Sequence, residues 1–330
     1  MKKFIMGVCV CLAILTLVSS AFAEELYDWH LRGINTGLAN GALPPPGAYF
    51  INNFYFQGTW KLYGNNDEAN PAVRLNGYVD VPVLLWNPGI SPVLGADYAC
   101  ALVQPFSQST LRIGDLSGSQ WGAYNTILVP FILSWEIPCH LHVAASFGIG
   151  FNDGTTSPGN SLAATTKVYR PDMLMSPDGK NVYGWASNDN YTFTPSIGIS
   201  WLYEGWNLSA EFDYTFWTKD TDCDYQNGDQ FAADYTATYT CGKWTFGAVG
   251  EQENQLYNDK GHLVQNGPYG KIPNSCQVNY AAGPYIGYNF GPCSLSFSYF
   301  FAIMTKNDLG GDWALLRLVI PLGNPCSWYK

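Results

Sequence analysis

Residues 208–217 alternate between apolar and polar side chains with a period of two, and this pattern constrains the fold more than any other feature of the chain. Leu208, Phe212 and Phe216 lie on one side of the alternation, whereas Glu211 and Asp213 lie on the other. A period of two is typical of a β-strand with one apolar and one polar face. Because residues 231–239 and 294–303 repeat the pattern, the sequence predicts several such strands.

The N-terminus has the features of an export signal. Lys2 and Lys3 precede an apolar run from Phe4 to Val18, and Ala21 and Ala23 supply small residues at the −3 and −1 positions. We therefore expect residues 1–23 to be a signal peptide that is cleaved after Ala23. Exported strands with one apolar face predict a transmembrane β-barrel in the outer membrane of a Gram-negative bacterium.

The composition agrees with a barrel and argues against binding to nucleic acid. Aromatic residues make up 16% of the chain and charged residues only 13%, as expected where lipid-facing positions are apolar and lumenal positions are uncharged polar residues. Lys2 and Lys3 account for two of the 16 basic residues, so the mature chain carries a net charge of about −12. A chain this acidic is not expected to have a nucleic-acid partner.

We predict an all-β, up-and-down antiparallel barrel of about 12 strands, with 14 as the alternative, over residues 48–322. The expected strands are 48–62, 73–86, 92–105, 123–135, 140–152, 191–203, 206–218, 230–240, 243–256, 277–290, 293–305 and 312–322. Longer, external segments are expected near residues 63–72, 106–122, 153–190, 219–229 and 257–276. They alternate with tight turns, which places both termini and a tail of residues 323–330 in the periplasm.

Tryptophans fall near the predicted periplasmic ends of the strands. An aromatic girdle at that membrane interface is therefore expected from Trp86, Trp135, Trp201, Trp206, Trp244 and Trp328.

If the apolar faces point to lipid, the barrel lumen receives polar side chains that could line a substrate pathway. The expected lumenal residues are Arg74, Asn76, Tyr78, Asp80, His142, Ser146, Asn152, Glu211, Asp213, Asp234 and Glu251. With Arg74 or Arg317 as counter-charge, the carboxylates could form a binding or selectivity patch. The alternative, which the large interior of such a barrel favours, is that they are paired or hydrated filler.

The strand at residues 123–135 breaks the alternation, because it is apolar on both faces and contains Pro130. Proline cannot donate to the strand ladder, so a bulge or local opening is expected there. Such an interruption is either a plain structural bulge or a lateral exit for hydrophobic solutes.

A segment rich in glycine and proline, residues 24–47, precedes the first strand. Leu43, Pro44, Pro45 and Pro46 form a stiff extended stretch, and the glycines upstream permit tight folding. The segment is expected either to plug the lumen or to be a disordered periplasmic leader.

Several motifs in order resemble one family of outer-membrane transporters. They are residues 41–49 (Gly-Ala-Leu-Pro-Pro-Pro-Gly-Ala-Tyr), 78–86, 94–98, 113–115, 234–235 and 318–322. Together they resemble the family named for the MetA pathway of phenol degradation, which comprises SphA-like β-barrels. The resemblance implies passive uptake of small hydrophobic or aromatic compounds. The cysteines and the tail ending at Lys330 depart from the family pattern.

Cysteine and histidine positions give no sign of a metal site or a catalytic triad. The cysteines lack the close spacing of metal ligands, so no metal or other cofactor is expected. Two disulfide bonds, Cys293–Cys326 and Cys223–Cys276, are hypotheses that the strand map allows. His30, His140, His142 and His262 have no convincing serine or aspartate partner by motif, so we do not expect an enzyme.

Three functions remain open at this point. The first is a transport barrel for small hydrophobic or aromatic compounds. The second is a general porin. The third is a surface structural or adhesion barrel, or an enzyme, that uses residues 153–190 as a lid, a constriction or a surface patch. The expected partners are outer-membrane lipid, a small hydrophobic or aromatic solute and the outer-membrane assembly machinery.

Overall fold

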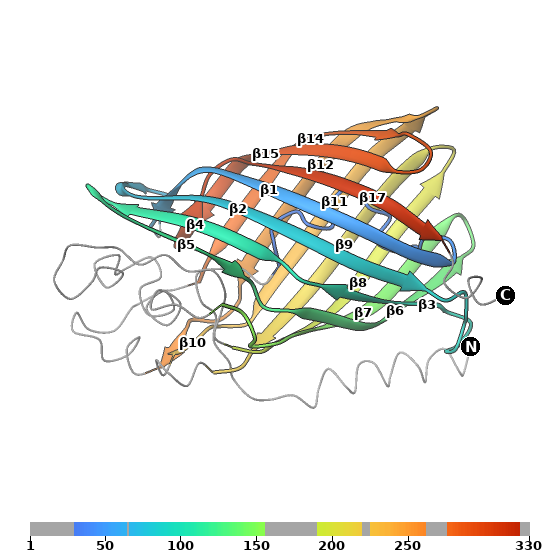
Figure 1. The fold of residues 1–330 in the computed structure, drawn as a ribbon, viewed down its shortest axis with the longest axis horizontal. Coiled ribbons are helices and arrows are strands. Elements are labelled where there is room, and N and C mark those ends of the chain that lie inside the picture. The colour runs from blue at the N-terminus through green and yellow to red at the C-terminus, as the bar shows by residue number, and fades with distance from the viewer. Residues whose placement is uncertain (1–29, 65, 156–189, 220–224, 262–275, 324–330) are drawn as a thin grey trace.

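The chain forms a closed antiparallel barrel of 12 strands (Figure 1). The computed structural model describes residues 30–64, 66–155, 190–219, 225–261 and 276–323. Strand β1 closes the barrel, because it pairs with both β2 and β17. No helix in the described ranges is long and apolar enough to span a membrane.

The strands of the wall lie close to their predicted positions. They are β1 (Gly47–Tyr63), β2 (Ala69–Asn87), β3 (Asp97–Val103), β4 (Phe106–Ile113), β5 (Leu116–Ala123), β6 (Ile127–Ile137), β7 (Leu141–Gly150), β8 (Thr192–Tyr203), β9 (Trp206–Trp217), β11 (Gln230–Cys241), β12 (Trp244–Gln255), β14 (Val278–Asn289), β15 (Ser294–Lys306) and β17 (Trp313–Gly323). Three short strands lie among the longer connections, β10 (Tyr225–Gln226), β13 (Lys260–Gly261) and β16 (Asp308–Gly310).

Two strands of the wall are interrupted, and here the prediction of an external segment at 106–122 is wrong. Strands β3 and β4 form one broken strand, since both pair with β2 and only Gln104 and Pro105 separate them. Proline lacks the N–H that a continuous ladder needs. Strands β4 and β5 then form a hairpin around Gly114 and Asp115, whose many serine, glycine and glutamine residues hide it from a search for alternating apolar residues.

The predicted irregularity at Pro130 is a bulge. The register between β6 and β7 shifts between Leu128 and Phe131, and the freed carbonyl of Pro130 accepts a hydrogen bond of 2.8 Å from the hydroxyl of Tyr98. The bulge therefore lets β6 present Ile127, Val129 and Ile132 toward the interior.

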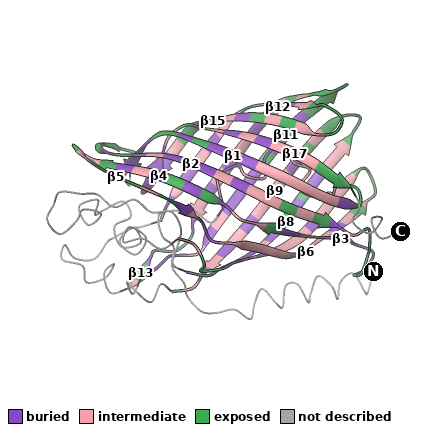
Figure 2. Cartoon of the chain, in the orientation of Figure 1, coloured by how far each residue is buried: buried purple, intermediate pink, exposed green. Residues whose placement is uncertain are grey.

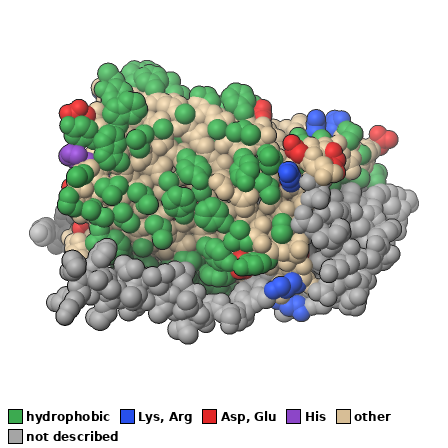
Figure 3. Space-filling model, turned by 180° about the vertical axis from the view of Figure 1, so that it is seen from behind, with side chains coloured by type: hydrophobic (Ala, Val, Ile, Leu, Met, Phe, Trp, Pro, Cys, Tyr) green, Lys and Arg blue, Asp and Glu red, His purple; other side chains and the backbone are tan. Residues whose placement is uncertain are grey.

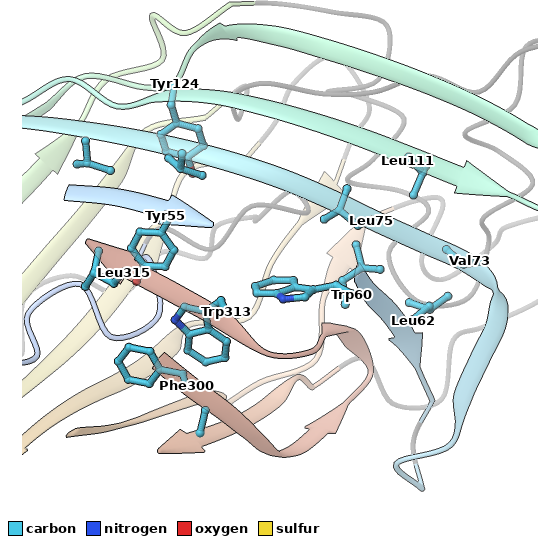
Figure 4. Close-up of a cluster of buried hydrophobic side chains, with 14 of the residues drawn as sticks. Tyr55, Trp60, Leu62, Val73, Leu75, Leu111, Tyr124, Phe300, Trp313 and Leu315 are labelled. Carbon is cyan, nitrogen blue, oxygen red and sulfur yellow. The ribbon is translucent and has the colours of Figure 1, made fainter. Parts of the chain in front are cut away.

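An apolar core fills part of the barrel interior (Figure 4). At its centre the rings of Phe300 and Trp313 stack with 4.9 Å between their centroids, and Trp60 meets Trp313 edge to face at 5.9 Å. Strand β2 contributes Val73, Leu75, Val79 and Val81, all nearly completely buried. The lumenal face of β2 is thus apolar.

The residues of β2 that alternate with these buried ones face outward, so the prediction of four lumenal positions on this strand is wrong. Arg74 and Tyr78 are exposed, and Asn76 and Asp80 are partly exposed on the same outer face. The assumption that apolar side chains always face lipid fails on this strand because the interior beside it is itself an apolar core. Figure 2 shows buried residues alternating with more exposed ones along much of β1 and β2.

Elsewhere the outer wall follows the expected rule. Hydrophobic side chains gather over the wall, and charged side chains lie mostly toward its two ends (Figure 3). Trp86, Trp206 and Trp244 at the short-turn end are each more than 40% exposed, as expected of an interfacial girdle. The end with long connections is the external end by the usual rule for such barrels.

Candidate functional site: a lumenal cavity beside an acidic belt

The strand register brings five carboxylates together on the lumenal wall. Glu211 on β9 lies opposite Asp234 on β11, which in turn lies opposite Glu251 on β12. Asp213 and Glu253 occupy the next lumenal positions on β9 and β12. We call these five residues, Glu211, Asp213, Asp234, Glu251 and Glu253, the acidic belt. The register and the burial of Asp213, Asp234 and Glu251 agree with the inward orientation that alternation predicts for them, whereas Glu253 was not among the predicted positions.

Residues 30–46 run through the interior and contact the wall on several sides (Figure 1). The amide of Gly41 donates to Ser200 on β8 and its carbonyl accepts from Ser134 on β6, at 2.8 and 2.7 Å. The amide of Gly37 donates to Thr236 on β11 at 2.7 Å. We call residues 30–46 the inner segment.

Glycines allow this close approach. Gly37 has a φ of +78°, in the left-handed region, and a Cβ there would lie 2.2 Å from the ring of Tyr285. A Cβ on Gly198 of β8 would lie 2.0 Å from the carbonyl oxygen of Asn40. The inner segment therefore fits against the wall only where side chains are missing.

The inner segment carries the counter-charges of the belt. His30 is buried between two carboxylates, with Nδ1 3.2 Å from Asp213 and Nε2 3.1 Å from Asp234. Burial alone would lower the pKa of His30, but Asp234 and Asp213 together hold it well above its usual value. The two carboxylates therefore stabilise the protonated, imidazolium form of His30.

Arg32 makes the second charged contact. Its Nε donates to Glu253 at 3.0 Å, and its terminal nitrogens donate to the Asp308 carboxylate at 2.6 Å and the Leu309 carbonyl at 3.1 Å. The guanidinium also lies over the ring of Trp60, 4.9 Å from its centroid. The guanidinium fixes one end of the inner segment by contacts to β12, β16 and β1.

Arg317 of β17 faces the lumen but does not neutralise the belt. Its guanidinium donates to Asn53 and to the carbonyl of Thr36, both at 2.6 Å, and to the carbonyl of Ile34. The predicted counter-charge role of Arg74 is wrong, since Arg74 faces outward, and Arg317 makes no ion pair with the belt among the described residues. His30 and Arg32 fill that role, and the signal that could have revealed them is their place as the last titratable residues before the first strand.

Two members of the belt have no hydrogen-bond donor among the residues that the structure describes. Both oxygens of Glu251 are buried without a partner, and Glu211 makes no hydrogen bond or ion pair with any described residue while facing the same interior. The interpretation of the carboxylates as paired filler thus describes Asp213, Asp234 and Glu253 but not Glu211 and Glu251.

A cavity of about 550 Å³ lies between the inner segment and the wall. Most of its lining is aliphatic or aromatic and comes from the inner segment and from β1, β2, β3 and β6: Leu31, Ile34, Leu38, Leu43, Pro44, Tyr49, Ile51, Val81, Val83, Leu85, Ala101, Val103, Ile127, Val129 and Ile132. The opposite end is polar and includes His30, Asn53, Ser146, Ser196, Glu211, Asp213 and Arg317. The cavity is therefore amphipathic, with an apolar wall that faces an acidic end.

The remaining predicted positions lie apart from this cavity or at its edge. His142 occupies a lumenal position on β7 opposite Ser200, nearer the short-turn end. Pro45 and Pro46 are exposed, and Asn152 is exposed at the opposite end of the barrel. Cys223 and Cys326, one partner of each hypothetical disulfide, lie outside the described residues, as do most of the loop at 153–190 and the tail after Gly323.

Comparisons with known proteins agree with this geometry. A family described as "Putative MetA-pathway of phenol degradation" matches residues 174–318, which confirms the family resemblance. The COG4313 outer membrane channel of Pseudomonas putida F1 has a similar structure, with a TM-score of 0.65 and 12% identity over 84% of this chain and 96% of that chain. The chain has the fold of an outer-membrane channel.

Two further solved structures are more distant. The translocator domain of autotransporter NalP from Neisseria meningitidis gives a TM-score of 0.45 and 11% identity over 84% of this chain and 90% of that chain. The toluene transporter TodX of Pseudomonas putida gives a TM-score of 0.38 and 10% identity over 91% of this chain and 95% of that chain. No curated protein matches the sequence.

Proposed function

We propose that the protein is a passive outer-membrane channel for small hydrophobic or aromatic compounds. The observation that carries the proposal is the cavity, because about 550 Å³ bounded mainly by aliphatic side chains suits a small apolar molecule and repels hydrated ions. The matched family description, with its reference to phenol degradation, supports an aromatic substrate. The signal peptide is proposed to end at Ala23, and the assembly machinery to insert the barrel into outer-membrane lipid.

Residues 24–47 act as a plug in this proposal. The ion pairs of His30 and Arg32 and the hydrogen bonds from Arg317 hold the described part of this segment against β9, β11, β12, β16 and β17. Asp213, Asp234 and Glu253 serve as its anchors. Glu211, at the polar end of the cavity, is proposed to contact the solute, whereas Tyr78, Asp80 and Arg74 lie outside this pathway.

The interrupted wall supplies a route for solute between membrane and cavity. Strand β5 pairs only with β4, and β7 pairs with β6 only from Ile127 onward. Between β5 and β7, residues 151–155 close the wall through isolated hydrogen bonds rather than a continuous ladder, such as the 2.8 Å hydrogen bond from the Thr155 amide to the Ala123 carbonyl. The cavity reaches Pro105, Tyr124 and Ile127 beside this weakly bonded part of the wall, so a small local opening there would connect the cavity to lipid.

The apolar core and the inner segment disfavour a general porin, which needs an open aqueous lumen. Among the described residues, His30 bridges two carboxylates and has no nucleophilic side chain in contact, so the structure offers no catalytic pair on which to base a proposal of catalysis.

Single-channel conductance in planar bilayers tests the plug. We expect the mature chain to conduct weakly and a chain lacking residues 24–43 to conduct strongly and steadily. Large, equal conductance in both proteins would instead support a general porin and contradict the plug.

Binding of naphthalene to the refolded barrel in nanodiscs, followed by naphthalene fluorescence, tests the cavity. Ala101→Phe fills space on the inner face of β3, where Ala101 is only 7% exposed, and should weaken binding at least tenfold. Leu102→Phe, on the outer face of the same strand, is the matched control. Equal binding by wild type and Ala101→Phe would place the solute elsewhere.

A further inference from the structure

Three basic side chains stand side by side on the outer surface at the external end of the barrel. The register places Lys61 on β1 opposite Arg74 on β2, and Arg74 opposite Arg112 on β4. All three are exposed and share the outward face, because Leu62, Val73 and Leu111 beside them are buried in the interior. We call Lys61, Arg74 and Arg112 the basic row.

Like charges in directly opposed positions of a sheet destabilise it unless an anion lies between them. In the part of the chain that the structure describes, none of the three forms an ion pair, and the one hydrogen bond from Arg74 goes to the backbone carbonyl of Pro71. This grouping is notable in a chain with 16 basic and 26 acidic residues. An external anion placed between the three cations would relieve this repulsion.

Polarity changes in layers as the outer face of β2 runs toward the basic row. Tyr78 lies in an aromatic layer with Phe56 and Trp121. The side chain of Tyr78 is 49% exposed and that of Trp121 is 68% exposed. The next layer holds hydroxyl and amide groups, in which Asn76 donates to Thr59 at 3.2 Å and Thr110 contacts Ser119 at 2.8 Å. The basic row is the third layer.

These layers follow the order of chemical groups in the outer leaflet of an outer membrane. Aromatic side chains mark the boundary of the hydrocarbon region. Four residues separate Tyr78 from Arg74, about 13 Å along a strand and about 10 Å along the membrane normal at the usual tilt. The hydroxyl layer is then level with a sugar head group, and the basic row is level with its phosphates.

We propose that the basic row binds the phosphates of the phosphorylated glycolipid that forms the outer leaflet, with the hydroxyl layer against its sugars. The three cations span two interstrand steps, about 10 Å. That span fits a disaccharide with a phosphate toward each end better than a lipid with one phosphodiester. The site lies on the outer wall and does not depend on the lumenal channel function.

The test is binding of diphosphoryl lipid A to the refolded full mature chain, measured by native mass spectrometry and by the shift in thermal unfolding. We expect Lys61→Gln, Arg74→Gln and Arg112→Gln each to weaken binding about fivefold, and the triple variant to lose most of it, since each basic residue near an anionic membrane surface contributes comparably. Raising the salt concentration should weaken wild-type binding.

Lys243→Gln, which removes one exposed positive charge at the opposite rim, is the charge-matched control for Arg74→Gln and should bind as wild type does. Folding of each variant is checked by the heat-dependent gel shift of the barrel, and the single variants serve if the triple variant does not fold. Three outcomes would overturn the proposal: unchanged binding by the single variants, equal binding of lipid A with its phosphates removed, or equal competition by phosphatidylglycerol.

Discussion

At the residue scale, the charges of the lumen are divided between two parts of the chain. The barrel wall supplies the acidic belt, and the inner segment supplies His30 and Arg32. Neither set is satisfied without the other, because a buried charge that loses its partner is strongly destabilising. Contacts of single residues should therefore control whether the inner segment stays in place.

His30 gives the first prediction, which concerns alkaline pH. The pKa of His30 is raised in the folded barrel, so the ion pairs are complete below its unfolded value of about 6.5 and are lost as pH rises through the folded value. We expect the conductance of the mature chain to rise over that alkaline range. In His30→Gln, conductance should be higher at neutral pH and insensitive to this change, whereas an unchanged pH profile would contradict the role of His30.

Arg32 gives the second prediction. Arg32→Leu removes the guanidinium that pairs with the buried carboxylates of Glu253 and Asp308 and should cost about 3–5 kcal/mol of the free energy that holds the inner segment. Hydrogen exchange of residues 30–42 should become much faster, while exchange of the wall strands stays slow. Arg32→Lys, which keeps the charge but loses the forked geometry, should have an intermediate effect.

At the element scale, the contact between β8 and the inner segment depends on missing side chains. A Cβ on Gly198 would lie 2.0 Å from the Asn40 carbonyl oxygen, whereas one on Gly250 of β12 would meet its nearest atom at an ordinary 3.5 Å. Gly198→Ala should therefore displace the inner segment near Asn40, and Gly250→Ala should not. Hydrogen exchange and conductance measure the difference, and equal behaviour of the two variants would place the segment elsewhere.

The same elements show what a sequence can predict of such a barrel. On β9, β11 and β12 one face is apolar and the other acidic, and the predicted bounds agree with the structure to within about one residue. On β2 the interior is apolar, so the outward positions of Arg74 and Asp80 depend on which neighbours share the lumen, and a period of two does not contain that information. The partners of the belt were missed for a related reason, since 183 or more positions in the sequence separate His30 from Asp213 and Asp234.

At the scale of the whole molecule, the lumen should change character when the inner segment is absent. The chain lacking residues 24–43 keeps all five carboxylates of the belt but loses His30 and Arg32, so its pore should select strongly for cations. Reversal potentials in a salt gradient measure this selectivity. Glu211→Gln with Glu251→Gln in the same shortened chain should reduce it, and an unselective pore would show that the belt does not line the conducting path.

The closure of the barrel by β1 also bears on how the protein folds. Residues 49–57 of β1 pair with residues 313–321 of β17, so this ladder joins the two ends of the barrel strands in sequence, and contacts this distant in sequence form slowly. The inner segment immediately precedes β1 and contacts β9, β11 and β12, so we expect it to enter the lumen before the ladder between β1 and β17 is complete. Folding is therefore expected to end in one concerted step, in which the wall closes around its own N-terminal residues and the last buried charges find their partners.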